Sequence, residues 1–160
     1  MSYIEASEMT SALENSQFLT FSLAGEEYGV DILKIQEIKG YVPTTRIPNS
    51  PPEIVGVLNL RGTIVPVMDL RKKFGLEAVQ YDSFTAIVVA AVRNRVIGMI
   101  VDQVSEVVTI PTKDIQPPPI ESVGVDHSLE GLARVGDKLI ILLDVEAVLL
   151  SDVTEFELAA

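Results

Sequence analysis

Residues 56–69 read GVLNLRGTIVPVMD, and residues 131–144 read GLARVGDKLIILLD in the same register without a gap. In each stretch two apolar runs flank a turn that contains glycine, and an aspartate ends the second run. Apolar runs on both sides of a short glycine turn are typical of a β-hairpin. Upstream of each hairpin, residues 28–38 match residues 97–107. We therefore interpret the chain as one structural unit that is present twice.

Each copy of this unit has the composition of short antiparallel strands, because β-branched residues alternate with polar ones between glycines, prolines, asparagines and aspartates. Gly25 and Asn94 mark the first hairpin turn of each copy. The expected strands span residues 18–23, 27–30, 56–60, 64–68, 84–91, 96–101, 105–110, 131–135 and 139–143. This pattern predicts a mainly β fold of two small antiparallel barrels that pack together. A β-sandwich is the alternative, since alternation does not separate closed from open sheets.

Short helices are expected after each half, the second of them near the C-terminus. Asp69 and Asp144 end matching strands, and their carboxylates suit the N-cap of a helix. The cations of residues 71–73 suit the end of the first helix, and Gly75 suits the left-handed residue that follows it. The alternative for this basic cluster is a binding patch for an anionic partner.

The charge and composition of the chain exclude several classes of function. The 160 residues include 12 basic and 23 acidic side chains, and the formal charge of −11 repels nucleic acid and anionic lipid. Residues 1–16 and 151–160 contain six acidic residues and no lysine or arginine, and we predict that both are mobile tails around a folded unit of residues 17–150. Apolar runs fall far short of the roughly 20 residues of a membrane helix, and cysteine is absent. We expect a cytoplasmic protein without membrane insertion.

The sequence gives little support to catalysis. The single histidine, His127, lies in the polar loop 125–128, where successive side chains point in different directions, and we interpret it as a solvated loop residue. Glycine motifs that cradle phosphate and the spacings of metal loops are absent from the sequence. We expect no enzyme, no cofactor and no metal site. A small β-barrel enzyme or ligand carrier is the alternative in a different class.

Two charged residues of the first half are candidates for a binding surface. Arg61 occupies a hairpin turn where the second half has Gly136, and it is either a forked donor for carboxylates of a partner or an ordinary exposed arginine. In residues 32–39 we expect three isoleucines to face inward, Lys34 and Glu37 to face outward, and Leu33 to be an exposed apolar spot. The three isoleucines are Ile32, Ile35 and Ile38. The proline-rich segments 40–53 and 111–119 predict connectors rather than central strands.

In combination, residues 28–38, 46–49 and 56–71 closely resemble the CheW family of chemotaxis coupling proteins. The likeness covers about residues 17–150 and includes the second half. It implies two five-stranded SH3-like β-barrels with a hydrophobic core between them, built from interleaved halves of roughly residues 17–80 and 84–150. Two related kinds of protein, the histidine kinase and a fusion of a coupling protein with a receiver domain, contain a similar domain but need further domains. We expect no room for those domains in this chain.

The function that this resemblance implies is scaffolding. CheW-like proteins join the cytoplasmic tips of methyl-accepting chemotaxis receptors to the regulatory domain of the histidine kinase CheA in membrane-associated arrays. Ile35, Glu37 and Arg61 resemble the family's receptor contacts, and Gly56 and Val57 resemble its kinase-contact region. We hypothesise that a receptor helix lies in the apolar seam between the barrels, where Arg61 and Glu37 set its register. A non-flagellar pathway and rings with further copies of the protein are open alternatives.

Overall fold

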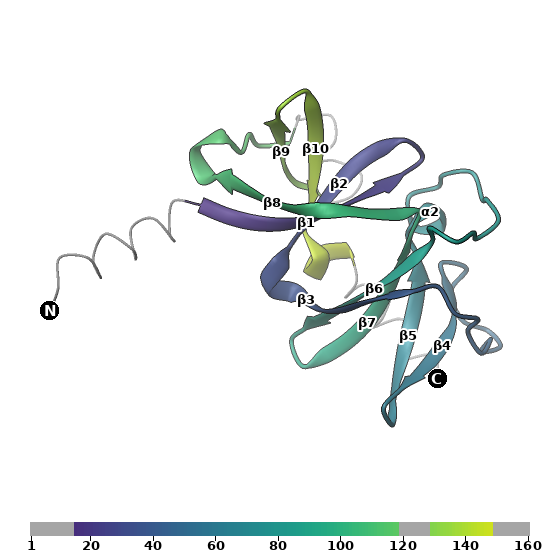
Figure 1. Cartoon of the computed structure of the whole chain (residues 1–160). Helices are drawn as coiled ribbons and strands as arrows, with labels where there is room; N and C mark the ends of the chain where they lie inside the picture. The colour runs from purple at the N-terminus through teal and green to yellow at the C-terminus, as the bar shows by residue number, and fades with distance from the viewer. Residues whose placement is uncertain (1–14, 119–128, 149–160) are drawn as a thin grey trace, which may run out of the picture.

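The computed structural model describes residues 15–118 and 129–148. Within these residues, ten strands form two five-stranded sheets, sheet A in the upper part of Figure 1 and sheet B in the lower part. Sheet A has the order β8-β1-β2-β10-β9, and sheet B has the order β3-β6-β7-β5-β4. The strands of sheet A are β1 (Asn15–Leu23), β2 (Glu26–Asp31), β8 (Gln103–Pro111), β9 (Leu129–Val135) and β10 (Lys138–Leu143). Those of sheet B are β3 (Ile35–Gly40), β4 (Ile54–Leu60), β5 (Thr63–Asp69), β6 (Ala86–Val92) and β7 (Arg95–Val101).

The predicted fold class, mainly β with two five-stranded units, is confirmed. The residues up to 14 and from 149 onward, which include most of both predicted tails, lie outside the described residues, as does His127. Strand β1 begins at Asn15, inside the segment that we assigned to the N-terminal tail. In the part of the chain that the structure describes, no helix has the length and hydropathy needed to cross a membrane.

Each sheet combines strands from both copies of the repeated unit. Sheet A joins β1 and β2 of the first copy to β8, β9 and β10 of the second, and sheet B joins β6 and β7 of the second copy to β3, β4 and β5 of the first. Two pairs, β2 with β10 and β5 with β7, are parallel, which differs from the antiparallel pairing that we expected. These paired strands come from different copies, so no tight turn forces them to run in opposite directions.

Backbone bridges close both sheets beyond their edge strands. The chain after β3 returns to the opposite edge of sheet B, where Thr45 and Val57 exchange hydrogen bonds of 2.9 and 2.8 Å. Gln116 and Leu132 form the equivalent bridge in sheet A, with hydrogen bonds of 2.8 and 2.9 Å. The residue before each bridge on the edge strand is glycine, and a Cβ at Gly56 would lie 2.6 Å from the Thr45 carbonyl oxygen. This close approach explains why both matching stretches begin with glycine.

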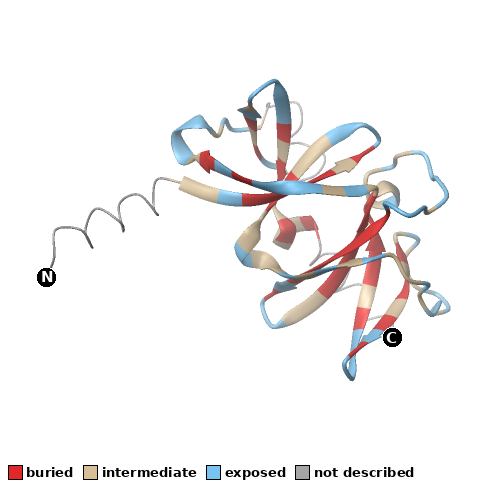
Figure 2. Ribbon diagram, in the orientation of Figure 1, coloured by how far each residue is buried: buried red, intermediate tan, exposed pale blue. Residues whose placement is uncertain are grey.

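The buried side chains form three clusters, one inside each barrel and a larger one between them. Figure 2 marks the buried residues in red along the strands of both sheets. The central cluster contains Leu19 and Phe21 of sheet A together with Val88 and Met99 of sheet B. Because both sheets contribute to this cluster, the two barrels bury apolar area against one another, which fixes them as one unit.

The expected helix caps are present. Asp69 is the N-cap of helix α2 (Leu70–Lys73), and its Oδ1 accepts a hydrogen bond of 2.9 Å from the Arg71 backbone N–H. Gly75 follows the helix with a φ of +70°, in the left-handed region. Asp144 precedes a helical turn over residues 145–148, and its Oδ1 accepts from the Ala147 N–H at 3.2 Å. These predictions are therefore confirmed.

Our orientation of residues 32–39 was wrong for Glu37 and Ile38, whereas Ile32 and Ile35 pack against the central cluster as expected. A 3₁₀ turn, η1 (Ile32–Lys34), is followed directly by strand β3, in which Glu37 is partly buried while Ile38 is 44% exposed. The spacing of three between isoleucines suggested one inward face. Side chains in a strand alternate with a period of two, so the consecutive residues Glu37 and Ile38 point to opposite faces of the sheet. Leu33 is 88% exposed, as expected.

Candidate functional site

Glu37 and Arg61, two of the three predicted receptor contacts, form an ion pair in which Arg61 Nη2 donates to Glu37 Oε1. Glu37 lies on β3 and Arg61 on the turn between β4 and β5, so the pair joins the two edge strands of sheet B. The Arg61 side chain is 71% exposed and that of Glu37 is 26% exposed. Since a guanidinium has five N–H donors, Arg61 can hold Glu37 and still offer donors to a partner carboxylate.

The turn that carries Arg61 is a two-residue hairpin turn. Leu60 pairs with Thr63, and the residues between them have positive φ, 50° at Arg61 and 89° at Gly62. The Asn59 side-chain oxygen accepts a hydrogen bond of 2.8 Å from the Gly62 N–H. Positive φ at both central positions is the geometry of a type I′ turn. This turn places the Arg61 side chain beyond the end of the strand pair, at the tip of the barrel.

A hollow of about 210 Å³ lies beside this ion pair. It is lined by Arg61, by Gln36 of β3 and by residues of the neighbouring strands, among them Val65 and Val96. Two exposed apolar side chains lie near the pair in sequence: Ile38, which follows Glu37, is 44% exposed, and Ile64, three residues after Arg61, is 61% exposed. A forked donor, a shallow hollow and exposed apolar groups together form a surface suited to contact with another protein.

Ile35, the third predicted receptor contact, has a different position. It is half-buried and packs against the central cluster, at the point where the chain passes from sheet A to sheet B. The turn before it is held by Asp31, whose Oδ1 accepts a hydrogen bond of 2.9 Å from the Leu33 N–H. Leu33 therefore projects from an ordered turn next to the seam between the barrels.

Gly56 and Val57, the predicted kinase contacts, lie near the start of β4, whereas Arg61 follows its end. Val57 and Arg61 are four positions apart along the chain, which corresponds to roughly 13 Å of extended strand. Gly56 is buried, and its side of the strand is covered by the Thr44 side chain and the Thr45 carbonyl oxygen. Gly56 therefore acts by allowing Thr44 and Thr45 to approach, while Val57, which is only partly buried, is accessible at the surface.

Sequence reasoning missed an ion pair that joins the two sheets. Arg71 Nε and Nη2 donate to the two carboxylate oxygens of Asp102 at 2.8 and 2.6 Å, and Arg71 Nη1 donates to the Glu77 carbonyl oxygen at 2.7 Å. Asp102 also accepts from the Ala24 N–H at 2.9 Å, in the turn between β1 and β2. The bond from Arg71 lowers the pKa of the Asp102 carboxyl below its ordinary value. We assigned Arg71 only to the helix terminus, because the sequence gives no signal that pairs it with Asp102.

A second ion pair between the sheets is formed by Arg93, in the turn between β6 and β7, and Glu146, in the helical turn after β10. Its arginine is 74% exposed, whereas Arg71 is 13% exposed. The half-buried Arg71–Asp102 pair is therefore the stronger constraint on the angle between the barrels. Within residues 15–118 and 129–148, no three histidine, cysteine or acidic side chains are grouped as metal ligands would be.

Comparison with known proteins adds independent information. A family model described as a CheW-like domain matches residues 17–153. The chemotaxis protein CheW of Klebsiella aerogenes is 44% identical over 147 residues, which cover 91% of this chain and 89% of that protein. The chemotaxis protein CheW of Bacillus subtilis is 33% identical over 144 residues, 88% of this chain and 92% of that protein. The crystal structure of the scaffolding protein TtCheW from Thermoanaerobacter tengcongensis matches with a TM-score of 0.76 and 38% identity, covering 81% of this chain and 89% of that one.

Proposed function

We propose that this chain, which belongs to the CheW-like family, binds a chemoreceptor and the kinase CheA through two surfaces that share strand β4. It is a chemotaxis adaptor that couples receptors to the kinase. The observation that carries the two-surface proposal is the Glu37–Arg61 pair at the tip of sheet B, where Arg61 is 71% exposed while one of its nitrogens, Nη2, donates to Glu37.

The receptor surface comprises Ile35, Glu37 and Arg61. A receptor helix would place its apolar side against the seam near Leu33 and Ile35, and a carboxylate of the helix would meet Arg61. Burial of the apolar side supplies most of the affinity, and the forked charge contact fixes the register. The Glu37 carboxylate holds the guanidinium in place before the receptor arrives, which lowers the entropic cost of binding.

The kinase surface lies at Gly56 and Val57, at the other end of β4. Its backbone is held by the Thr45–Val57 bridge, so the surface is formed before a partner binds. An adaptor transmits a signal only if the two receptor states contact it differently. A roughly 13 Å stretch of one strand connects the two surfaces, and this strand is the shortest route for such a difference.

We further propose that the protein acts in the cytoplasm at membrane-associated receptor arrays, without catalysis of its own, and that residues 17–150 suffice for both interactions. The relatives named above are described as chemotaxis and scaffolding proteins, which supports this assignment. Contacts with further copies of the protein would complete rings in such arrays.

Binding of the purified protein to a receptor cytoplasmic fragment and to the isolated CheA regulatory domain tests the proposal. We expect both to bind with micromolar or tighter dissociation constants, measured by calorimetry. If neither binds at about 100 μM while a small metabolite raises the melting temperature, the chain is a ligand-binding protein instead.

A further inference from the structure

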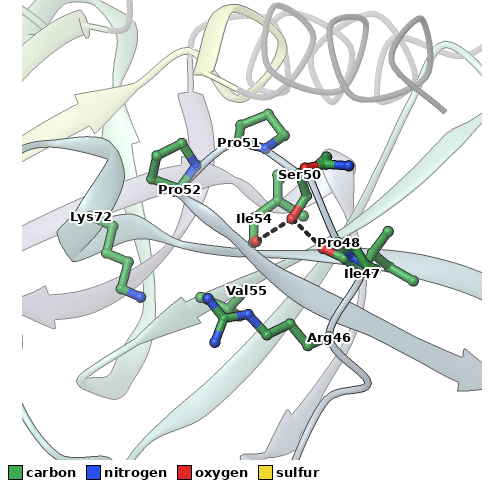
Figure 3. Close-up of a pocket in the computed structure, with 10 residues that line it drawn as sticks. Arg46, Ile47, Pro48, Ser50, Pro51, Pro52, Ile54, Val55 and Lys72 are labelled. Atoms are coloured by element: carbon green, nitrogen blue, oxygen red, sulfur yellow. Dashed lines mark hydrogen bonds between the residues drawn. The ribbon is translucent and has the colours of Figure 1, made fainter.

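A pocket of about 290 Å³ opens between the proline-rich connector after β3 and helix α2 (Figure 3). The connector and the start of β4 supply most of its wall, through residues 46–52, 54 and 55, and Lys72 of α2 supplies the rest. The pocket thus joins two segments that lie more than fifteen residues apart in the sequence.

The wall of this pocket is ordered by local bonds. Ser50 Oγ lies within hydrogen-bond distance of the carbonyl oxygens of Ile47, at 3.0 Å, and Ile54, at 3.3 Å. The Ile54 N–H donates to the Pro51 carbonyl oxygen at 3.0 Å, and Asn49 turns the chain with a φ of +65°. Three prolines restrict the backbone further. Because the shape is formed in advance, a partner group can enter without ordering the loop.

Two cations, Arg46 and Lys72, line the pocket, and their charged ends point toward one another in Figure 3. Among the residues that the structure describes, neither side chain has an ion-pair or hydrogen-bond partner. In contrast, Arg61, Arg71 and Arg93 each pair with an acidic residue. Two neighbouring cations left without an anion are notable in a protein with a formal charge of −11.

The dipole of helix α2 accounts for this arrangement only in part. Lys72 lies in the last turn of the helix, where a cation is favourable, but Arg46 is on the connector. The wall residues Ile54 and Val55 immediately precede Gly56 and Val57 on β4, so the pocket is continuous with the proposed kinase surface. Val55 lies two residues before Val57 on the same strand, so a protein that covers Val57 would also reach the opening of the pocket.

We propose that the pocket receives an aspartate or glutamate side chain of the kinase regulatory domain, an inference that rests on the function proposed above. Arg46 offers a forked pair of donors, and Lys72 offers a point charge to the same carboxylate. Docking would shield both cations from water and so strengthen their attraction for the carboxylate. The contact would therefore fix the orientation of the kinase domain on the barrel.

The double variant Arg46→Glu/Lys72→Glu tests this proposal. The control is Lys113→Glu/Lys138→Glu, which makes the same change in net charge at two exposed lysines associated with sheet A. Calorimetric titration with the CheA regulatory domain should show affinity at least about tenfold weaker for the pocket variant at about 50 mM salt, and nearly unchanged affinity for the control. The difference should shrink at about 300 mM salt, and receptor binding should be retained by both variants.

Equal kinase affinity of the two double variants would overturn the pocket inference while leaving the proposed function intact. If the unmodified protein fails to bind the kinase domain, both the proposed function and the pocket inference are wrong. Inorganic phosphate serves as a further probe by NMR titration. Submillimolar phosphate binding that depends on Arg46 and Lys72, with kinase affinity unchanged in the pocket variant, would show a small-anion site instead. Recovery of binding by an acidic-to-lysine change in the kinase domain would identify the partner residue.

Discussion

Replacement of Gly56 by alanine should weaken both the fold and kinase binding. The new Cβ would lie 2.5 Å from Thr44 Oγ1 and 2.6 Å from the Thr45 carbonyl oxygen, so the connector must move away from β4. Overpacking costs about 1–3 kcal/mol, and weakening the Thr45–Val57 bridge costs about 1 kcal/mol more. We expect the free energy of unfolding to fall by about 2–4 kcal/mol in urea titrations followed by circular dichroism.

Two other glycines provide controls for this experiment. Nothing lies within 4 Å of a Cβ at Gly40, so Gly40→Ala should leave stability unchanged or raise it by up to about 1 kcal/mol. A Cβ at Gly131 would lie 2.7 Å from the Gln116 carbonyl oxygen, so Gly131→Ala should destabilise sheet A to a similar degree as Gly56→Ala destabilises sheet B. At a temperature where all variants are folded, only Gly56→Ala should lose kinase affinity, by about tenfold or more.

This reasoning is refuted if Gly56→Ala is as stable as Gly40→Ala. The kinase assignment is refuted if Gly131→Ala weakens kinase binding as much as Gly56→Ala does. Both results come from the same set of proteins, so the structural and the functional parts of the prediction can fail separately.

Three further predictions concern stability and the extent of the binding unit. Asp102 has a lowered pKa in the folded state, so its contribution to the free energy of unfolding is present above about pH 4 and is lost as the pH falls through that lowered pKa. Arg71→Met should therefore lower the free energy of unfolding by about 2 kcal/mol at pH 7. In urea titrations below pH 4, the stability difference between Arg71→Met and the unmodified protein should diminish. Asp69→Ala removes both a helix cap and the acceptor of the Tyr81 hydroxyl at 2.6 Å. It should lower the free energy of unfolding by about 2 kcal/mol in thermal melts, against about 1 kcal/mol for Asp144→Ala, which removes a cap alone. Equal losses of stability in the two variants would show that the Tyr81–Asp69 hydrogen bond does not stabilise the fold. A fragment of residues 17–150 should bind receptor and kinase within about threefold of the full chain in calorimetry, and a larger loss would assign a binding role to the segments removed.

The sequence predicted the features that depend on neighbouring residues. The hairpins, the caps at Asp69 and Asp144 and the left-handed Gly75 follow from local turn and helix chemistry, and the structure contains all of them. Strand β3 was missed because its isoleucines are spaced by three across a 3₁₀ turn. The repeat itself indicates this strand, because residues 35–38 match residues 104–107, and a strand was predicted there over residues 105–110, within β8.

Features that join distant residues could not be read from the pattern. The exchange of strands between the two sheets depends on which edges meet in three dimensions, and a pattern of alternation specifies faces but not neighbours. The Glu37–Arg61 pair closes a gap between opposite edges of one sheet, and Arg71–Asp102 links two sheets. For Glu37 and Arg61 the resemblance to the family pointed to the individual residues, while their contact with one another emerged only from the fold.

The most direct test of the account is the affinity of a receptor cytoplasmic fragment for the Arg61→Glu variant. Arg61→Asn is the control, because asparagine followed by glycine suits the type I′ turn while removing the charge. Arg61→Glu places a carboxylate beside Glu37, and we predict that it weakens receptor binding by about tenfold or more in calorimetry. Arg61→Asn should weaken receptor binding less. Both variants should retain kinase affinity within about twofold of the unmodified protein. Receptor binding by Arg61→Glu at the affinity of the unmodified protein would contradict the central claim that this ion pair lies in the receptor surface.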